Sequence, residues 1–243
     1  MPARGRITLI ALLLVGCGGA STPAPTPAAA IADDPDQAFA ALQQRLLAAK
    51  SIDVAVEVQS SAPYPSLLTG TLALRAGNQL DLSVDGEFSG QKVYLRLRSQ
   101  HGRLRGGPGG DGDRAIDQPT PAALDEAVII GLVRMGLLHN LALLSASLPP
   151  DHAAGGAADW VVTTEHTWDR GRDQTIDGRS ARALAYQLSV DGQRVGEGTL
   201  WLDAETGLPL KREVDVHFSG EGESGASGTM HVSETYLKFE VTP

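Results

Sequence analysis

The chain is poor in cysteine, in aromatic residues and in basic charge. It has 243 residues and a single cysteine, Cys17, so no disulfide can form within the chain and burial must supply the stability of the fold. Aromatic residues make up 5%, and 20 Lys and Arg against 29 Asp and Glu give a net charge of −9. An acidic chain without a basic stripe interleaved with aromatics is not expected to bind nucleic acid. The same charge argues against the protein body docking flat on an anionic bilayer.

Motifs that would mark a catalytic or metal site are also missing from the sequence. The six histidines do not stand at zinc-ligand spacing, and neither His-Glu-x-x-His nor Gly-x-Ser-x-Gly occurs. Asp111, Asp113 and Asp117 approach a calcium loop, but Ile116 and Ala122 occupy positions where that pattern needs Gly and Glu. We therefore expect no enzymatic activity, no metal and no cofactor.

The single cysteine closes an N-terminal segment that has the features of a signal peptide. Two arginines precede an apolar run of nine residues, 7–15, which is far shorter than the roughly 20 residues of a membrane span. Residues 14–17 read Leu-Val-Gly-Cys and resemble the lipobox of bacterial lipoproteins. The resemblance implies that residues 1–16 are removed and that acyl chains on Cys17 anchor the mature protein to a membrane. A cut elsewhere, which would leave Cys17 as a free buried thiol, is the alternative.

The segment that follows Cys17 predicts a tether. Residues 18–33 are rich in Pro, Ala, Gly and Ser and contain no aromatic residue. As a flexible coil this segment would span roughly 20–25 Å, which keeps the folded body near the membrane. Gly18 and Gly19 stand where an aspartate would retain an enterobacterial lipoprotein at the inner membrane. The resemblance therefore implies a lipid anchor in the bacterial cell envelope, at the outer membrane and facing the periplasm.

The rest of the chain, 34–243, predicts a single α+β domain. An apolar stripe at helical spacing predicts a helix that begins at Asp34 and ends near residue 50. No parallel strand–helix–strand rhythm occurs, so we expect a strongly curved antiparallel sheet of about nine to eleven strands wrapped on helices. Alternating apolar and polar residues predict the strands at 52–58, 71–75, 80–85, 93–98, 160–163, 183–190, 195–202, 210–218 and 231–241.

The most apolar stretch of the folded part is 121–148, between the two sets of strands. Its apolar residues cover nearly every side of a helix, and such a helix is normally buried. Arg134, His139 and Asn140 interrupt it, which argues against the alternative of a transmembrane helix. We expect a buried helix, or two helices divided at one of its glycines.

Three segments resemble the LolA/LolB-like and LppX/LprG-like lipoprotein family. The first is the helix that runs into a strand at 42–58. The second, Gly-Thr-Leu-Ala-Leu-Arg at 70–75 with Asn78 following, is similar to the Gly-x-Leu-x-x-Arg-Pro-Asn stretch of LolA-type carriers. The third, Leu-Trp-Leu-Asp at 200–203 with Gly-Leu-Pro after it, looks like a hairpin common in the family. The likeness spans most of 36–243.

The resemblance implies a half-barrel of antiparallel strands whose concave mouth is closed by helices and whose cavity binds acyl chains. The arginine that helps to latch the closing helix in that family corresponds to Arg75. We therefore expect an anchored lipoprotein that binds or transfers a lipid or a lipidated protein in an apolar cavity. The alternative is a structural or sensory lipoprotein of the same fold, with a filled core and protein partners.

Strand parity and the apolar faces of the central segment select the residues that would line such a cavity. A shift of one residue in register would move the set of any strand to the other face of the sheet. A cavity and a packed core bury the same residues, so the sequence leaves both open, and for the tryptophan core packing is the alternative. The expected lining residues are Val54, Val56, Leu72, Leu74, Leu82, Leu95, Ile130, Met135 and Trp201.

Overall fold

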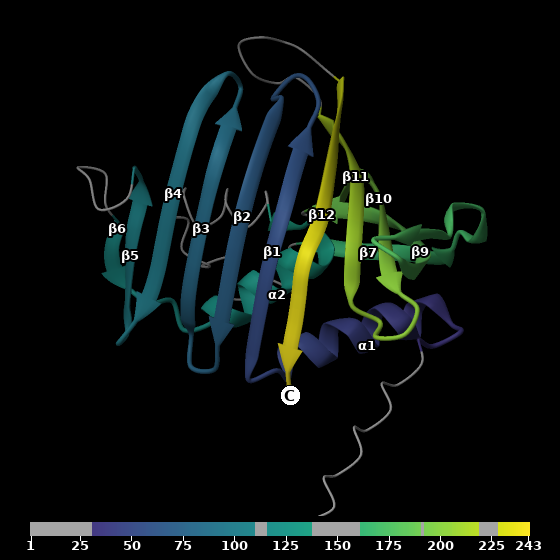
Figure 1. Cartoon of the computed structure of the whole chain (residues 1–243), viewed down its shortest axis with the longest axis horizontal. Helices are drawn as coiled ribbons and strands as arrows, with labels where there is room; N and C mark the ends of the chain where they lie inside the picture. The colour runs from purple at the N-terminus through teal and green to yellow at the C-terminus, as the bar shows by residue number, and fades with distance from the viewer. Residues whose placement is uncertain (1–30, 110–115, 138–160, 191, 219–227) are drawn as a thin grey trace, which may run out of the picture.

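A computed structural model of the protein describes residues 31–109, 116–137, 161–190, 192–218 and 228–243 (Figure 1). The predicted signal segment, the acylation site at Cys17 and most of the tether lie outside the described residues. The elements are, in chain order, α1 (Pro35–Leu47), β1 (Ser51–Ser60), β2 (Ser66–Arg75), β3 (Gln79–Phe88), β4 (Gln91–Gln100), β5 (Arg103–Pro108), β6 (Ile116–Pro119), α2 (Leu124–Arg134), β7 (Val161–Trp168), the 3-10 helix η2 (Arg170–Arg172), β8 (Gln174–Ile176), β9 (Arg179–Val190), β10 (Gln193–Asp203), β11 (Pro209–Phe218) and β12 (Gly228–Thr242).

The strands form one twelve-stranded antiparallel sheet, which confirms the predicted α+β half-barrel. The strand order is β6-β5-β4-β3-β2-β1-β12-β11-β10-β9-β7, and β8 pairs with β9. The C-terminal strand β12 lies between β1 and β11, so it joins the two halves of the chain in one sheet. Figure 1 shows the sheet curving, with α2 behind β1 and β2.

The sheet has more strands than the pattern of alternation predicted. The short strands β5, β6 and β8 fall in segments where the sequence pattern predicts no strand. Gly106 and Gly107 nevertheless pair with β4, and Asp117 pairs with β5. Such pairing uses backbone groups, so a segment rich in Gly and Pro can form a ladder without showing the pattern.

Helix α1 forms for the reasons that the sequence indicates. The carboxylate of Asp34 caps it by accepting a hydrogen bond from the backbone N–H of Gln37 at 2.9 Å. Pro35 stands in the first turn, and Ala48 is the C-cap. The buried residues of the helix are Ala38, Phe39, Leu42 and Leu46.

Helix α2 is shorter than the apolar stretch that predicted it. It spans 11 residues, and the rest of the predicted stretch, from residue 138 onward, lies outside the described part of the chain. The backbone N–H groups of Met135 and Gly136 both donate to the carbonyl of Gly131, which ends the helix. Gly136 has φ +90°, and a Cβ there would lie 2.3 Å from the carboxylate of Glu234. Within the described ranges, no helix has the length and apolar character needed to cross a membrane.

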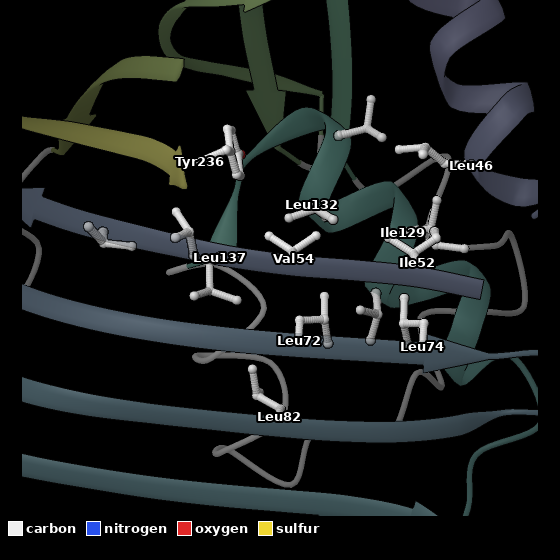
Figure 2. Close-up of a cluster of buried hydrophobic side chains, with 14 of the residues drawn as sticks. Leu46, Ile52, Val54, Leu72, Leu74, Leu82, Ile129, Leu132, Leu137 and Tyr236 are labelled. Carbon is white, nitrogen blue, oxygen red and sulfur yellow. The ribbon is translucent and has the colours of Figure 1, made fainter. Parts of the chain in front are cut away.

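The main core lies between the sheet and the two helices. Side chains of β1–β4 alternate strictly, so that the concave face is apolar and the outer face is polar. Leu132 and Ile129 of α2 pack on this concave face, as Figure 2 shows. Gly70 makes room for Leu137, three residues after the end of α2, since a Cβ at Gly70 would lie 2.5 Å from Cδ2 of that leucine.

Candidate functional site

The concave face of β1–β4 is the candidate site for an apolar ligand. Six of the expected lining residues lie there, are at most 5% exposed, and belong to one cluster with α2. The strand register places Val54 opposite Leu72 and Leu72 opposite Leu82. Figure 2 shows these side chains directed toward α2. The six are Val54, Val56, Leu72, Leu74, Leu82 and Leu95.

The other three expected lining residues lie elsewhere. Ile130 is 2% exposed but is not part of the main cluster. Met135 is half-buried and packs against a separate cluster at the other end of the sheet. Trp201 packs with Ala181, Ala183 and Leu210, because its neighbours Leu200 and Leu202 take the concave side of β10. The structure therefore places Trp201 on the outer face, one residue out of phase with the expected set.

Asn78, in the turn between β2 and β3, holds the N-terminal end of α2. Its Nδ2 donates to the carbonyl of Ala122 at 2.8 Å, and its Oδ1 accepts from the backbone N–H of Asp125 at 3.0 Å. The carboxylate of Asp125 accepts in turn from the N–H of Asn78 at 2.7 Å. Helix α2 has no side-chain cap of its own at Ala123, so this exchange with the sheet replaces a local cap.

Only one of the two carboxylate oxygens of Asp125 is satisfied in this arrangement. Its Oδ1 is buried and has no hydrogen-bond partner among the described residues. Burial raises the pKa of the carboxyl, although the hydrogen bond from Asn78 acts in the opposite direction. The N-terminal attachment of α2 therefore carries an electrostatic cost at neutral pH.

Arg75 does not make the contact expected of a latch. Its guanidinium donates to Asp53 at 2.8 Å and to the carbonyls of Leu74 and Ile52, all on β1 and β2. Its side chain is 45% exposed. Among the described residues Arg75 has no hydrogen bond to α2, because its position in β2 directs it to the outer face. Asn78, three residues later, makes the contact instead.

The C-terminal end of α2 is held by two buried charged residues of β11 and β12. Nη2 of Arg212 donates to the carbonyls of Leu132 and Val133 at 2.7 and 2.8 Å. Glu234, directly opposite in the sheet, accepts from the N–H of Leu137 at 2.6 Å. The Arg212 Nε and Glu234 Oε2 atoms are 3.9 Å apart, and both side chains are 1% exposed. A cation at the carbonyl end of a helix is favourable.

Two tyrosines complete this C-terminal cluster of Arg212, Glu234, Tyr186 and Tyr236. The Tyr236 hydroxyl donates to Glu234 at 2.8 Å, and the Tyr186 hydroxyl donates to the carbonyl of Arg134 at 3.3 Å. Burial raises the pKa of both tyrosines, so they stay neutral and act as donors. Burial alone would lower the pKa of Arg212, but Tyr236, Tyr186 and Glu234 around it raise the pKa instead. The guanidinium therefore remains charged.

The sequence contained a signal for this cluster that alternation alone passes over. Arg212 stands between Leu210 and Val214, and Glu234 between Val232 and Tyr236, at positions where the pattern needs an apolar residue. A charged residue at a core-facing position on each of two strands indicates a buried ion pair. Arg212 and Glu234 lie close together because β11 and β12 are neighbours in the sheet, and only the structure shows that pairing.

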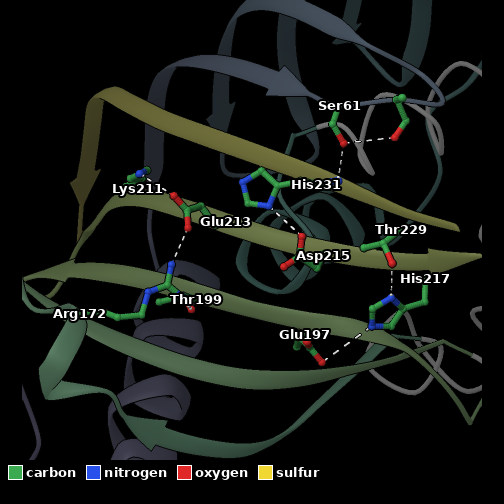
Figure 3. Close-up of polar contacts among 11 residues, drawn as sticks. Ser61, Arg172, Glu197, Thr199, Lys211, Glu213, Asp215, His217, Thr229 and His231 are labelled. Carbon is green, nitrogen blue, oxygen red and sulfur yellow. Dashed lines mark hydrogen bonds and ion pairs between the residues drawn. The ribbon is translucent and has the colours of Figure 1, made fainter.

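The outer face of β9–β12 carries polar contacts of a different kind (Figure 3). Glu213 pairs with Arg172 at 2.6 Å and with Lys211 at 2.7 Å beside a hollow of about 480 Å³. Asp215 pairs with His231 at 2.8 Å, and the N–H of His231 donates to the hydroxyl of Ser61 at 2.9 Å.

The residue types of a Ser-His-Asp triad therefore occur together on this face, but not with its geometry. The backbone of His231, and not its ring, contacts Ser61, so nothing activates that hydroxyl. The described part of the chain also holds no group of three or more His, Cys, Asp or Glu side chains that could bind a metal.

Comparison with known proteins gives matches to solved structures. No family model and no curated protein matches the chain. A structure of MucB is 15% identical, with 87% of this chain and 61% of that chain covered and a TM-score of 0.38. MucB in the Pseudomonas aeruginosa complex of MucA and MucB is 17% identical, with 85% and 58% covered and a TM-score of 0.37. The chain thus spans about three fifths of the MucB chains that it matches.

LolA-type proteins are also among the matches. A LolA superfamily protein from Nitrosomonas europaea is 11% identical, with 87% of this chain and 95% of that chain covered and a TM-score of 0.30. An outer membrane lipoprotein-sorting protein domain from Vibrio parahaemolyticus is 8% identical, with 86% and 93% covered and a TM-score of 0.32. At these identities and scores the likeness concerns the fold alone. By its own strand pairing and the placement of its helices, the protein is a half-barrel of antiparallel strands with helices packed on its concave face.

Proposed function

We propose that the protein binds the acyl chain of a lipid or of a lipidated protein on the concave face of its half-barrel, once α2 moves off that face. The observation that supports this is how α2 is attached. The helix lays apolar side chains on an apolar sheet, yet both its ends are fixed by polar side chains of the sheet: Asn78 at one end, Arg212 and Glu234 at the other. Such a helix can leave as a unit and expose a continuous apolar surface.

The energies of attachment and of ligand binding are of similar size. A neutral hydrogen bond contributes about 1 kcal/mol and a charged one about 2 kcal/mol, so the six contacts of Asn78, Arg212 and Glu234 hold α2 with on the order of 10 kcal/mol. Each buried methylene contributes about 0.8 kcal/mol, so about 14 methylenes supply roughly 11 kcal/mol. A long acyl chain can therefore offset these six polar contacts, and a short one cannot. The acyl chain must also replace the apolar packing of α2 on the sheet and the contacts of Arg134 with Gln43.

The predicted anchor determines where in the cell this binding would occur. Acyl chains on Cys17 and the tether of residues 18–33 would keep the half-barrel within a short distance of the membrane, where lipids and lipoproteins are its ligands. We propose the periplasmic side of the bacterial outer membrane. A permanently anchored protein of this kind would receive or hand on a ligand at one membrane.

A second candidate function follows from the packing of the concave face. Leu132, Leu137 and Ile129 already fill the space above β1–β3, and Leu137 approaches Gly70 closely. If α2 never leaves, the same fold is a structural or sensory lipoprotein that acts through protein partners. The two candidates differ in one property, which is whether the concave face accepts an apolar molecule.

Binding of fatty acids of two lengths distinguishes the candidates. The chain with Cys17→Ser carries no acyl anchor, so any lipid that native mass spectrometry finds on it is a ligand. We expect a fluorescent sixteen-carbon fatty acid to bind at least tenfold more tightly than an eight-carbon one, because methylene burial drives the exchange. Leu72→Gln, on the concave face, should weaken binding, and Thr71→Gln, exposed on the outer face of the same strand, should not. If neither fatty acid binds to the folded protein, the filled-core candidate replaces the first.

A further inference from the structure

Four arginines gather on the outer face of β4 and β5, away from the concave face. Arg96 and Arg98 alternate with buried leucines in β4, and Arg103 and Arg105 flank the buried Leu104 in β5. Their side chains are 43–65% exposed and surround a hollow of about 330 Å³. The hollow is a local exception in a chain whose net charge is −9.

The strand register sets two of these arginines against one another. Arg98 lies directly opposite Arg105 across β4 and β5, with Asp81 beyond Arg98 on β3 and Asp117 beyond Arg105 on β6. The row across the four strands therefore reads Asp, Arg, Arg, Asp. Like charges directly opposite in an antiparallel pair destabilise the sheet. The flanking aspartates relieve this repulsion only from the two sides.

The two aspartates do not neutralise the four arginines. Asp81 accepts from Nε and Nη2 of Arg98 at 3.0 and 2.7 Å and lies 3.9 Å from Arg96. Asp117 lies 2.5 Å from Arg103 and 3.3 Å from Arg105. The hydrogen bond from Arg103 lowers the pKa of Asp117, so the carboxylate stays charged. Each aspartate is shared by two guanidinium groups, and the six side chains carry a formal charge of +2, four positive and two negative.

We propose that this arginine hollow binds a phosphate group. An anion between Arg98 and Arg105 would turn the row into an alternation of charges from Asp81 to Asp117. The planar guanidinium fork matches two oxygens of a phosphate, and each arginine has five N–H donors, more than its contacts with the aspartates use. The site is distinct from the concave face and does not depend on acyl binding.

The surroundings favour a single phosphate group over a broad anionic surface. Asp85 and Glu87 lie on the outer face of β3, further along that strand than Asp81, and would repel an extended layer of negative charge. The net charge of the chain argues against flat docking for the same reason. One phosphate, on a phospholipid headgroup or on a soluble ester, can still reach the hollow.

Binding of inorganic phosphate, glycerol phosphate and vesicles tests this proposal and identifies the source of the phosphate. The probe protein is the chain with Cys17→Ser, which has no lipid anchor of its own. Calorimetry at low salt should detect glycerol phosphate or inorganic phosphate, and flotation should detect vesicles of phosphatidylglycerol but not of phosphatidylcholine. Binding should weaken as salt is raised. Binding to the vesicles alone assigns a lipid headgroup, and binding to the small anions alone assigns a soluble ester.

Matched arginine variants make the result specific to the hollow. Arg96→Gln with Arg105→Gln removes two charges that have the longest contacts to the aspartates and should weaken binding at least tenfold. Arg75→Gln with Arg194→Gln removes two arginines that are exposed to a similar degree elsewhere, and should leave binding within twofold. Thermal unfolding confirms that each variant is folded. The proposal is overturned if neither phosphate nor the anionic vesicles bind, or if both pairs of variants weaken binding equally.

Discussion

Arg212 and Glu234 stand opposite one another on β11 and β12, at positions where a buried sheet normally carries apolar side chains. The pair brings two charges out of water, which costs several kcal/mol for each ion. Both partners are bonded to α2 or to the chain just after it. Arg212 donates to two carbonyls of the helix, and Glu234 accepts from the N–H of Leu137, three residues after its end. Buried charges of two strands thus fix the C-terminal end of α2, in addition to the contacts that Arg134 of the helix makes with Gln43.

The Arg212–Glu234 pair predicts a non-additive effect on stability. Arg212→Met removes the guanidinium from beside the buried carboxylate of Glu234, so we expect the free energy of unfolding to fall by about 3–5 kcal/mol. Adding Glu234→Leu should recover part of that loss, because the buried carboxylate is then gone as well. Urea denaturation of both single variants and the double variant gives the coupling energy. Lys211→Met, on the opposite face, is the control and should cost about 1 kcal/mol or less. Additive losses would show that the pair does not act as a unit.

Asp203 is expected to account for part of the loss of folding stability at acid pH. Its Oδ1 accepts the backbone N–H groups of Glu205 and Thr206, both at 2.8 Å, and Arg179 pairs with the carboxylate. Burial acts to raise the pKa of Asp203, but these donors outweigh it and hold the pKa below its ordinary value of 3.8. Because the folded pKa is the lower one, the stabilisation is present above pH 3.8 and is lost as the pH falls through the folded pKa.

Asp203→Asn isolates this contribution of Asp203. We expect the variant to be less stable at pH 7 by about 1–2 kcal/mol, and the difference from the unsubstituted protein to shrink as the pH falls below 4. Urea midpoints at pH 7, 5, 4 and 3 measure it. Asp85→Asn, at an exposed carboxylate, is the control. A difference that stays constant with pH would contradict the role given to the ionised form of Asp203.

At the scale of elements, α2 stands out because residues of other elements supply most of the contacts that fix its two ends. A helix of 11 residues is marginal in isolation, and this one lacks a side-chain N-cap. It is attached to α1 through Arg134, whose Nη2 donates to Gln43 at 2.9 Å, and to the sheet through Asn78 and the C-terminal cluster. Its persistence therefore depends on tertiary contacts at identifiable points, and each point can be removed separately.

Asn78→Gly removes the N-terminal attachment without straining the turn. Asn78 has φ +58°, which glycine adopts freely, so the variant loses only the side-chain bonds to Ala122 and Asp125. We expect the amides of α2 to exchange their hydrogens about tenfold faster or more, and global stability to fall by about 1–2 kcal/mol. Hydrogen exchange followed by mass spectrometry measures both helices. Gln79→Ala, at the adjacent exposed residue, should change neither; faster exchange confined to α1 would contradict the assignment.

Local pattern predicted most elements but not how α2 is held. Alternation located β1–β4 and the concave positions such as Leu72, because a half-covered antiparallel sheet imposes a period of 2. It missed β5, β6 and β8, whose pairing is made by backbone groups in Gly-containing or short segments. The resemblance assigned the latch to Arg75 by sequence position, but the alternation of side chains along β2 directs Arg75 to the outer face. Asn78 and Arg212 reach α2 through neighbours distant in sequence, which no local window contains.

The whole molecule has an apolar interior and a charged outer face, on which basic and acidic groups gather in different regions. Strand β12 unites two meanders in one sheet, and both helices lie against its concave side (Figure 1). The outer face carries the arginine hollow on β4 and β5 and the acidic contacts of β9–β12. Apolar binding on one face and phosphate binding on the other would suit a protein that meets lipids, and each can be tested without the other.

Movement of α2 off the concave face on ligand binding is the central claim, and a distance across that contact tests it most directly. Because Cys17 is the only cysteine, the chain with Cys17→Ser can be labelled at introduced cysteines alone. Spin labels at Glu126→Cys on α2 and Thr71→Cys on β2 report the helix-to-sheet distance by pulsed electron resonance. Labels at Thr71→Cys and Gln193→Cys, both on the sheet, are the control.

We expect a sixteen-carbon fatty acid to lengthen or broaden the distance between Glu126→Cys and Thr71→Cys while the distance within the sheet stays fixed. An eight-carbon fatty acid should leave both distances as they are, because its methylenes contribute too little to release the attachments of α2. Unchanged helix-to-sheet distances with the long fatty acid bound, or no binding at all, would contradict the claim and leave α2 as a permanent part of the core.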